Sequence, residues 1–311
     1  MRLVADNGLN VRITPIPFRM SQPGKLDDAA SASRNARPGV RVPLDDRFFV
    51  SAGVRIRYVE EGEGAPVVLL HGYTSDLEDQ WIESGVLRAL ARDHRVIAFD
   101  ARGHGKSGKP HDPQAYGVEM ARDVVRLLDH LDIAKAHIVG YSMGAHILAQ
   151  LLTLHPERML TATLGGGTGR RNWTLADDHR VETQAAEMAR GRLDTQILRL
   201  WPVDQAMPGS EELGVLSADL LNGKDQLALA AVRRSNREQA VTEADMAAVK
   251  VPVLGIVGSV DAYLAHFRAL ERLIPHMKLV VIDDATHGSA PQRPEFVAAL
   301  REFIDAPIVR E

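Results

Sequence analysis

The sequence contains no cysteine in its 311 residues. This absence excludes disulfide bonds, thiolate metal ligands and a cysteine nucleophile, and it leaves the redox state of the compartment open. Long apolar runs are missing too, since none approaches the roughly 20 residues that a membrane-spanning helix needs. The N-terminus lacks an apolar segment of about 7–15 residues, so we expect no secretory signal and take the cytoplasm as the default location.

A strong excess of charge of one sign is also missing. The formal net charge is −4, which gives no reason to expect nucleic acid or a membrane as a partner. No histidine pair at i and i+4 has a carboxylate nearby, so we expect no metal and no cofactor. His104 and His111 come nearest to such a cluster, in a loop rich in Gly and Pro. The sequence leaves open whether the chain forms a homo-oligomer.

The remaining composition, 45% hydrophobic and 25% charged, is that of a globular protein. Its length fits one large domain or one domain with an insert. The first 44 residues hold five prolines and a small, polar run, which offers little to bury. We therefore expect an N-terminal arm over residues 1–45.

Apolar runs alternate with helical patterns over residues 46–164 and 251–311. Val67–Leu70 is apolar at consecutive positions, as in a strand covered on both faces, whereas Met120–Leu131 is apolar at every third or fourth position. This alternation predicts an α/β fold with a mostly parallel central sheet and helices on both faces. The expected strands lie near residues 48–50, 54–59, 67–70, 96–99, 136–139, 162–164, 251–257 and 278–282.

Residues 165–250 show helical periodicity alone, for example in Asp177–Arg190 and Lys224–Gln239. A crossover between parallel strands needs only a dozen or so residues. A segment this long between two buried strands therefore predicts an inserted helical cap. The alternative is a set of ordinary helices that cover the sheet.

Gly140–Gly144, of sequence GYSMG, carries the strongest chemical signal. It directly follows the expected strand at His137–Val139 and precedes a helical stretch, Ala145–Leu154. This strand–turn–helix setting is the one that a nucleophile elbow requires. Glycine is expected two residues before and two residues after Ser142, because larger side chains would collide in so tight a turn. Ser142 is therefore the predicted nucleophile.

A serine hydroxyl needs a base, and the base needs an acid that orients it. His287 follows the last apolar strand, and Asp261 follows a buried strand and a glycine turn, so both are expected at the carboxyl edge of the sheet. Asp283 and Asp284 compete with Asp261 because they are close to His287 in sequence. They would have to fold back to reach the imidazole.

His146 competes with His287, since it stands four residues after Ser142 on the expected helix. A side chain there normally points along the helix, away from the serine hydroxyl. The oxyanion of a tetrahedral intermediate also needs donors. The backbone N–H groups of Met143, after the nucleophile, and of Tyr73, on the loop after an early strand, are the expected pair.

These motifs together resemble the α/β-hydrolase superfamily, in the branch of small esterases, enol-lactonases and cofactor-free haloperoxidases. The resemblance covers about residues 46–306 and says nothing of the arm. It implies a triad of Ser142, Asp261 and His287, and it makes the loop at residues 100–108 a structural element near the site. The matching segments are His71-Gly72, Asp100–Gly108, Gly140–Gly144, Gly258–Asp261 and His287-Gly288.

A serine at the elbow argues against epoxide hydrolases and haloalkane dehalogenases, whose nucleophile is aspartate. The expected activity is hydrolysis of a small-molecule carboxylic ester or lactone through an acyl-enzyme. Three alternatives stay open: C–C bond hydrolysis and perhydrolysis (haloperoxidase activity) with the same triad, and a ligand receptor on a hydrolase fold. The cap is expected to set the substrate. Its candidate pocket residues are Trp173, Met188, Trp201 and Met207, each of which could instead pack inside the cap.

Overall fold

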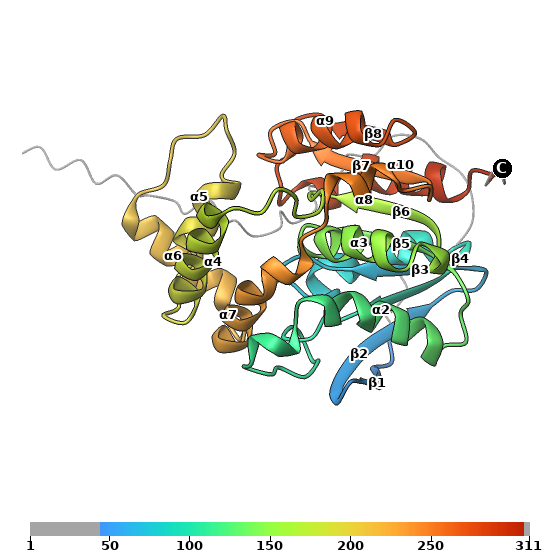
Figure 1. Ribbon diagram of the computed structural model, residues 1–311, viewed down its shortest axis with the longest axis horizontal. Helices are drawn as coiled ribbons and strands as arrows, with labels where there is room; N and C mark the ends of the chain where they lie inside the picture. Colours follow the sequence, from blue (N-terminus) through green and yellow to red (C-terminus); the bar gives the residue numbers. More distant parts are fainter. Residues whose placement is uncertain (1–43, 308–311) are drawn as a thin grey trace, which may run out of the picture. The chain divides into compact units, whose positions relative to one another are not determined.

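The computed structural model of the protein describes residues 44–307. The expected arm, residues 1–45, falls almost wholly outside this range. Eight strands form one sheet in the order β1-β2-β4-β3-β5-β6-β7-β8 (Figure 1). They are β1 (Arg47–Ser51), β2 (Val54–Glu61), β3 (Ala65–Leu70), β4 (His94–Phe99), β5 (Ala136–Tyr141), β6 (Met159–Gly165), β7 (Val253–Gly258) and β8 (Lys278–Ile282).

From β3 to β8 the strands run parallel, and β2 is antiparallel to both β1 and β4. The fold is therefore the predicted α/β fold with a mostly parallel sheet. The helices are α1 (Val86–Leu90), α2 (Val118–His130), α3 (Met143–Leu154), α4 (Leu175–Met188), α5 (Asp194–Leu200), α6 (Ser210–Leu221), α7 (Gln226–Arg234), α8 (Glu243–Ala247), α9 (Leu264–Leu273) and α10 (Pro294–Ile304). Short turns of other helix types are η1 (Glu78–Ile82), η2 (Pro113–Ala115), η3 (Pro156–Arg158), η4 (Ser235–Gln239) and η5 (Ala290–Gln292).

Helices cover both faces of the sheet, as the consecutive apolar residues of the strands require. On β3, Val68 and Leu70 join the buried cluster beneath α2, α3, α8 and α9. Val67 and Leu69 join the opposite cluster, beneath α1 and α10. Because successive side chains of a strand point to opposite faces, a strand buried on both sides must be apolar at every position.

The predicted hairpin forms the first two strands of the sheet. Ala52 and Gly53 join β1 to β2 with φ values of 46° and 79°. Two positive φ values in a two-residue loop match the twist of an antiparallel pair. The hairpin places β1 at one edge of the sheet, and β2 joins it to β4, the first of the parallel strands.

The helical insert, defined here as residues 165–250, lies between β6 and β7. Its helices α4, α5, α6 and α7 share a buried cluster of their own, which includes Met188, Ile197 and Leu229, and Figure 1 shows them gathered at one end of the sheet. Helix α8 differs, because its Met246 belongs to the cluster on the sheet. Within residues 44–307, no helix has the length and apolar character needed to cross a membrane.

Candidate active site

Ser142 sits in a sharp turn between β5 and α3. Its φ of 52° and ψ of −107° lie outside the regions that residues with a side chain ordinarily occupy. The Ser142 N–H donates to the Gly165 carbonyl at the end of β6, at 2.7 Å. Such strain persists only where the surroundings fix it, and it occurs preferentially at functional sites.

The two glycines of the elbow are sterically required. A Cβ on Gly140 would stand 2.3 Å from the Gly144 carbonyl oxygen, and a Cβ on Gly144 would stand 2.2 Å from the Leu70 carbonyl oxygen. In both cases the obstacle is backbone, which cannot rotate away. The two glycines are therefore needed because α3 packs closely on β3 and β5.

The structure brings Ser142, His287 and Asp261 together. His287 Nε2 lies 3.0 Å from Ser142 Oγ, and His287 Nδ1 lies 2.9 Å from Asp261 Oδ2. A carboxylate only accepts, so Nδ1 carries the proton and Nε2 is free to accept from the hydroxyl. Asp261 is buried, and its Oδ1 accepts the Tyr263 N–H at 2.9 Å. This arrangement can activate a serine hydroxyl as a nucleophile.

The rival aspartates do not contact the imidazole. Asp283 and Asp284 are exposed on the loop after β8. The Asp283 carbonyl accepts from Arg293, and the Asp284 N–H donates to Ser259 Oγ. His287 is instead held by the Tyr141 hydroxyl, which donates to its carbonyl at 2.6 Å. Burial raises the pKa of Tyr141 far above its usual value, so the phenol stays protonated as a donor.

The proposed oxyanion donors, the N–H groups of Tyr73 and Met143, flank the serine. Both residues line the same cavity as Ser142. A Cβ on Gly72 would stand 3.4 Å from Ser142 Cβ, so the Tyr73 loop passes close to the nucleophile. The Gly144 N–H donates to the His71 carbonyl at 3.1 Å, which ties this loop to α3. Among the described residues, the Tyr73 N–H has no backbone acceptor.

The loop at residues 100–108 supports the Tyr73 loop from within the core. Asp100 accepts from the backbone N–H groups of Leu77 and Lys106. The Ala101 N–H donates to His71 Nε2 at 3.0 Å. His104 lies edge-on to His71, and burial lowers its pKa well below the usual value. These contacts fit a structural element.

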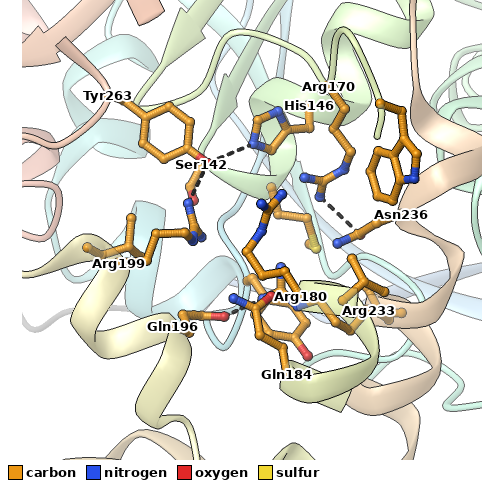
Figure 2. Close-up of a pocket in the computed structure, with 16 residues that line it drawn as sticks. Ser142, His146, Arg170, Arg180, Gln184, Gln196, Arg199, Arg233, Asn236 and Tyr263 are labelled. Carbon is orange, nitrogen blue, oxygen red and sulfur yellow. Dashed lines mark hydrogen bonds between the residues drawn. The ribbon is translucent and has the colours of Figure 1, made fainter. Parts of the chain in front are cut away.

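A cavity of about 600 Å³, including its opening to solvent, lies beside Ser142 (Figure 2). Of the four expected pocket residues, only Trp173 lines it. Met188 is buried in the cluster of the insert. The Trp201 indole N–H donates to the Ala206 carbonyl, and Met207 is 65% exposed. The structure places these three residues outside the lining of this cavity, because hydrophobic character alone does not tell the inner face of the insert from its core or surface.

The wall of this cavity is mainly polar and cationic. Figure 2 shows Arg170, Arg199 and Arg233 directed into it. No Asp or Glu lines it among the described residues. Burial and then the neighbouring Arg233 lower the pKa of Arg170 to about 9. The amide side chains of the wall are Gln184, Gln196 and Asn236.

His146 also lines the cavity, which the expected direction of its side chain did not indicate. Its Nε2 lies 3.4 Å from the Tyr263 hydroxyl. Burial, followed by the charges of Arg170, Arg199 and Arg233, lowers its pKa well below the usual value. A neutral imidazole therefore stands in the wall near the nucleophile.

The sequence reasoning missed Arg170, Arg199, Arg233 and Tyr263. Two signals were present. Arg170 follows the carboxyl end of β6, where sites assemble in such sheets, and Tyr263 stands two residues after Asp261. Arg199 and Arg233 lie on helices of the insert, where an arginine is more often solvent-exposed.

Comparisons with known proteins agree with the fold. A family model described as alpha/beta hydrolase fold matches residues 65–196. The enol-lactonase from Burkholderia xenovorans LB400 superposes with a TM-score of 0.68 at 26% identity, covering 84% of this chain and 100% of that chain.

Two further relatives differ in the activity that their names state. The chain is 32% identical to the dihydrolipoyllysine-residue acetyltransferase component of an acetoin cleaving system from Pseudomonas putida, over 76% of this chain and 62% of the relative. It is 37% identical to the 2-hydroxy-6-oxo-6-(2'-aminophenyl)hexa-2,4-dienoic acid hydrolase of Metapseudomonas resinovorans, over 40% of this chain and 43% of the relative. A second acetyltransferase component, from Cupriavidus necator, is matched over 30% of its length. The chain thus spans less than two thirds of each of these relatives.

Proposed function

Because this chain belongs to the α/β-hydrolase superfamily, we propose that it is a serine hydrolase that cleaves a carboxylic ester or lactone through an acyl-enzyme. The observation that carries the proposal is the hydrogen bond of 3.0 Å between Ser142 Oγ and His287 Nε2. A hydroxyl so placed can lose its proton to the imidazole as it attacks a carbonyl carbon.

The proposed reaction begins when Ser142 Oγ attacks the carbonyl and His287 takes its proton. Asp261 keeps the imidazole oriented and stabilises the imidazolium. The N–H groups of Tyr73 and Met143 hold the oxyanion, and each such donor contributes roughly 2.7–4 kcal/mol of barrier lowering. His287 then protonates the leaving alkoxide. Water attacks the acyl-enzyme by the same steps and releases the acid.

C–C bond hydrolysis is a second candidate. The relative from Metapseudomonas resinovorans is named as a hydrolase of a 2-hydroxy-6-oxo-dienoic acid. Such a compound contains no ester, so its hydrolysis must break a carbon–carbon bond beside the ketone. The same serine, histidine and aspartate would serve that reaction.

Covalent labelling tests the nucleophile directly. A fluorophosphonate is expected to label the protein once, on Ser142, and Ser142→Ala is expected to abolish both labelling and turnover of p-nitrophenyl esters. Ser210→Ala, at an exposed position on α6, is the matched control and should label normally. An adduct on another serine, or turnover retained in Ser142→Ala, would refute the assignment. Rates on p-nitrophenyl esters and lactones, measured beside a vinylogous diketone, separate the two reactions.

A further inference from the structure

Four arginines line the cavity beside Ser142. Arg180 pairs with Asp177, and the other three come from different parts of the chain. Arg170 lies on the segment after β6, Arg199 is in α5 and Arg233 is in α7. Figure 2 shows their guanidinium groups directed into the same space as Tyr263 and His146. Bringing three like charges together costs free energy unless something compensates them.

The protein partners of these three arginines are all neutral. Arg170 donates to the side-chain oxygens of Gln239 and Asn236, at 3.3 and 3.0 Å. Arg199 donates to the Tyr263 hydroxyl at 2.7 Å. Arg233 donates to Gln196 Oε1 and stacks over the Tyr73 ring, 4.0 Å from its centroid.

None of the three has a carboxylate within ion-pair distance in the described part of the chain, residues 44–307. Of the three, Arg233 is buried, whereas Arg170 and Arg199 are partly exposed. The other buried arginines of residues 44–307 differ in having carboxylate partners. Arg57 pairs with Asp46, Glu78 and Asp100, and Arg102 pairs with Asp123. Buried arginines are normally paired in this way. The cavity arginines therefore lack the counter-ion that this same fold supplies elsewhere.

Two donors in the wall are also unsatisfied. Arg233 is 6% exposed and Gln184 is 5% exposed, and the buried atoms Arg233 Nε and Gln184 Nε2 have no hydrogen-bond partner among the described residues. A buried donor without an acceptor costs about 1–3 kcal/mol. Both atoms carry N–H groups, so the missing partners are acceptor oxygens.

The titration of neighbouring groups reflects the same excess of positive charge. Burial alone would raise the pKa of Tyr263, but the charges of Arg199 and Arg170 outweigh burial and lower it. Burial and then Arg233 lower the pKa of Arg170 to about 9. An anion in the cavity would relieve both effects.

We propose that the substrate carries a carboxylate or phosphate group, away from the bond that is cleaved, and that Arg170, Arg199 and Arg233 bind it. A planar guanidinium can hold either oxyanion through two parallel hydrogen bonds. The group lies close to the reacting carbonyl, because Arg199 contacts the Tyr263 hydroxyl and the Tyr263 ring lies 5.7 Å from the His287 ring. The proposal rests on the proposed function for the identity of the bond that is broken.

Esters that differ only in charge test this directly. The p-nitrophenyl half-ester of glutaric acid carries a free carboxylate, and its methyl-capped counterpart is neutral and of similar shape. We expect kcat/KM to favour the anionic ester by about tenfold or more, as charge-assisted hydrogen bonds allow. A third p-nitrophenyl ester, of equal length but ending in a phosphonate group, shows which oxyanion the site binds better. Equal rates on all three esters would overturn the proposal.

Variants assign the effect to the three arginines. Arg170→Gln, Arg199→Gln and Arg233→Gln are each expected to lower the ratio of kcat/KM on the anionic ester to kcat/KM on the neutral ester by about tenfold, because the lost charge acts on the anionic ester. Arg234→Gln is the matched control, because Arg234 adjoins Arg233 on α7 but is exposed and pairs with Glu182. A ratio that falls equally in Arg234→Gln would overturn the assignment.

Binding to an inactive protein separates this proposal from the proposed function. Glutarate or inorganic phosphate should raise the Tm of Ser142→Ala, and the rise should be lost when Arg199→Gln is added. That result would stand even if no ester were ever cleaved. Arg199 has one described side-chain partner, so Arg199→Gln is the variant best suited to keep the fold. A Tm that neither anion changes would overturn the anion site, while labelling of Ser142 would still support the hydrolase.

Discussion

The reacting centre and the cavity wall meet at Ser142, yet they differ in how fully their polar groups are hydrogen-bonded. At the centre, Ser142, His287 and Asp261 are hydrogen-bonded to one another. In the wall, Arg233 and Gln184 keep buried donors that find no partner among the described residues. The centre is hydrogen-bonded within the protein, whereas the wall keeps donors that the proposed anion would satisfy. The comparison supports a division in which the sheet and its loops carry the proposed reaction and the insert supplies the arginines of the proposed anion site.

The largest expected effect comes from breaking the centre. Asp261→Asn should lower kcat far more than it raises KM, because the carboxylate stabilises an imidazolium that forms only in the transition state. In serine proteases, replacing the acid of the triad by asparagine costs about 10⁴ in kcat, and we expect a loss within about tenfold of that. Steady-state kinetics with melting curves measure it.

Asp283→Asn and Asp284→Asn are the controls for this change, since both side chains are exposed near His287. Each should stay within about tenfold of the wild-type kcat, because substitutions at exposed positions without a structural contact usually have small effects. If Asp261→Asn keeps most of its activity while one of them loses it, the acid has been misassigned.

A smaller, selective effect is expected from the wall. Trp173 lines the cavity, and its indole N–H donates to Asp178 at 2.8 Å. Trp173→Ala should change the ranking of p-nitrophenyl esters by acyl chain length more than it changes the rate on the acetate. A change of one methylene in a pocket is worth roughly 1–3 kcal/mol. A uniform loss on every ester would instead assign Trp173 to packing.

Acid should weaken the core, where neutral histidines are buried. Burial lowers the pKa of His137 to about 4, below the value of about 6.5 for an unfolded chain. The unfolded state therefore takes up the proton first, so this contribution is complete above about pH 6.5 and is lost as the pH falls towards 4. Urea unfolding at several pH values measures it, and His137→Gln should flatten the dependence over this window. If the free energy of unfolding falls as steeply with pH in His137→Gln as in the wild type, His137 is not the source of the acid sensitivity.

The smallest expected effect is from EDTA. No group of three His, Asp or Glu side chains within residues 44–307 is placed to hold a metal ion, and the proposed steps use none. Dialysis against EDTA should leave kcat unchanged within error. If EDTA removes activity and one specific divalent ion restores it, the serine, histidine and aspartate are not sufficient for the reaction.

The parts of this protein that could be predicted from sequence are those that local sterics determine. The glycines at 140 and 144 mark the elbow because backbone atoms surround them, and an apolar strand followed by Asp261 or His287 places those side chains at one edge of the sheet. The wall could not be predicted in this way. Arg199 and Arg233 meet only because α5 and α7 both pack against α4 in three dimensions, and no short motif encodes that packing.

The backbone conformation of Ser142 has a consequence for anyone engineering this protein. At φ 52° and ψ −107° a residue without a Cβ is less strained, and strain of this kind costs of order 1–3 kcal/mol. A library screened for heat resistance alone would therefore enrich glycine at position 142 and discard the hydroxyl that we propose as the nucleophile. Selection for heat resistance and selection for activity therefore favour different residues at position 142, so any such screen must also measure activity.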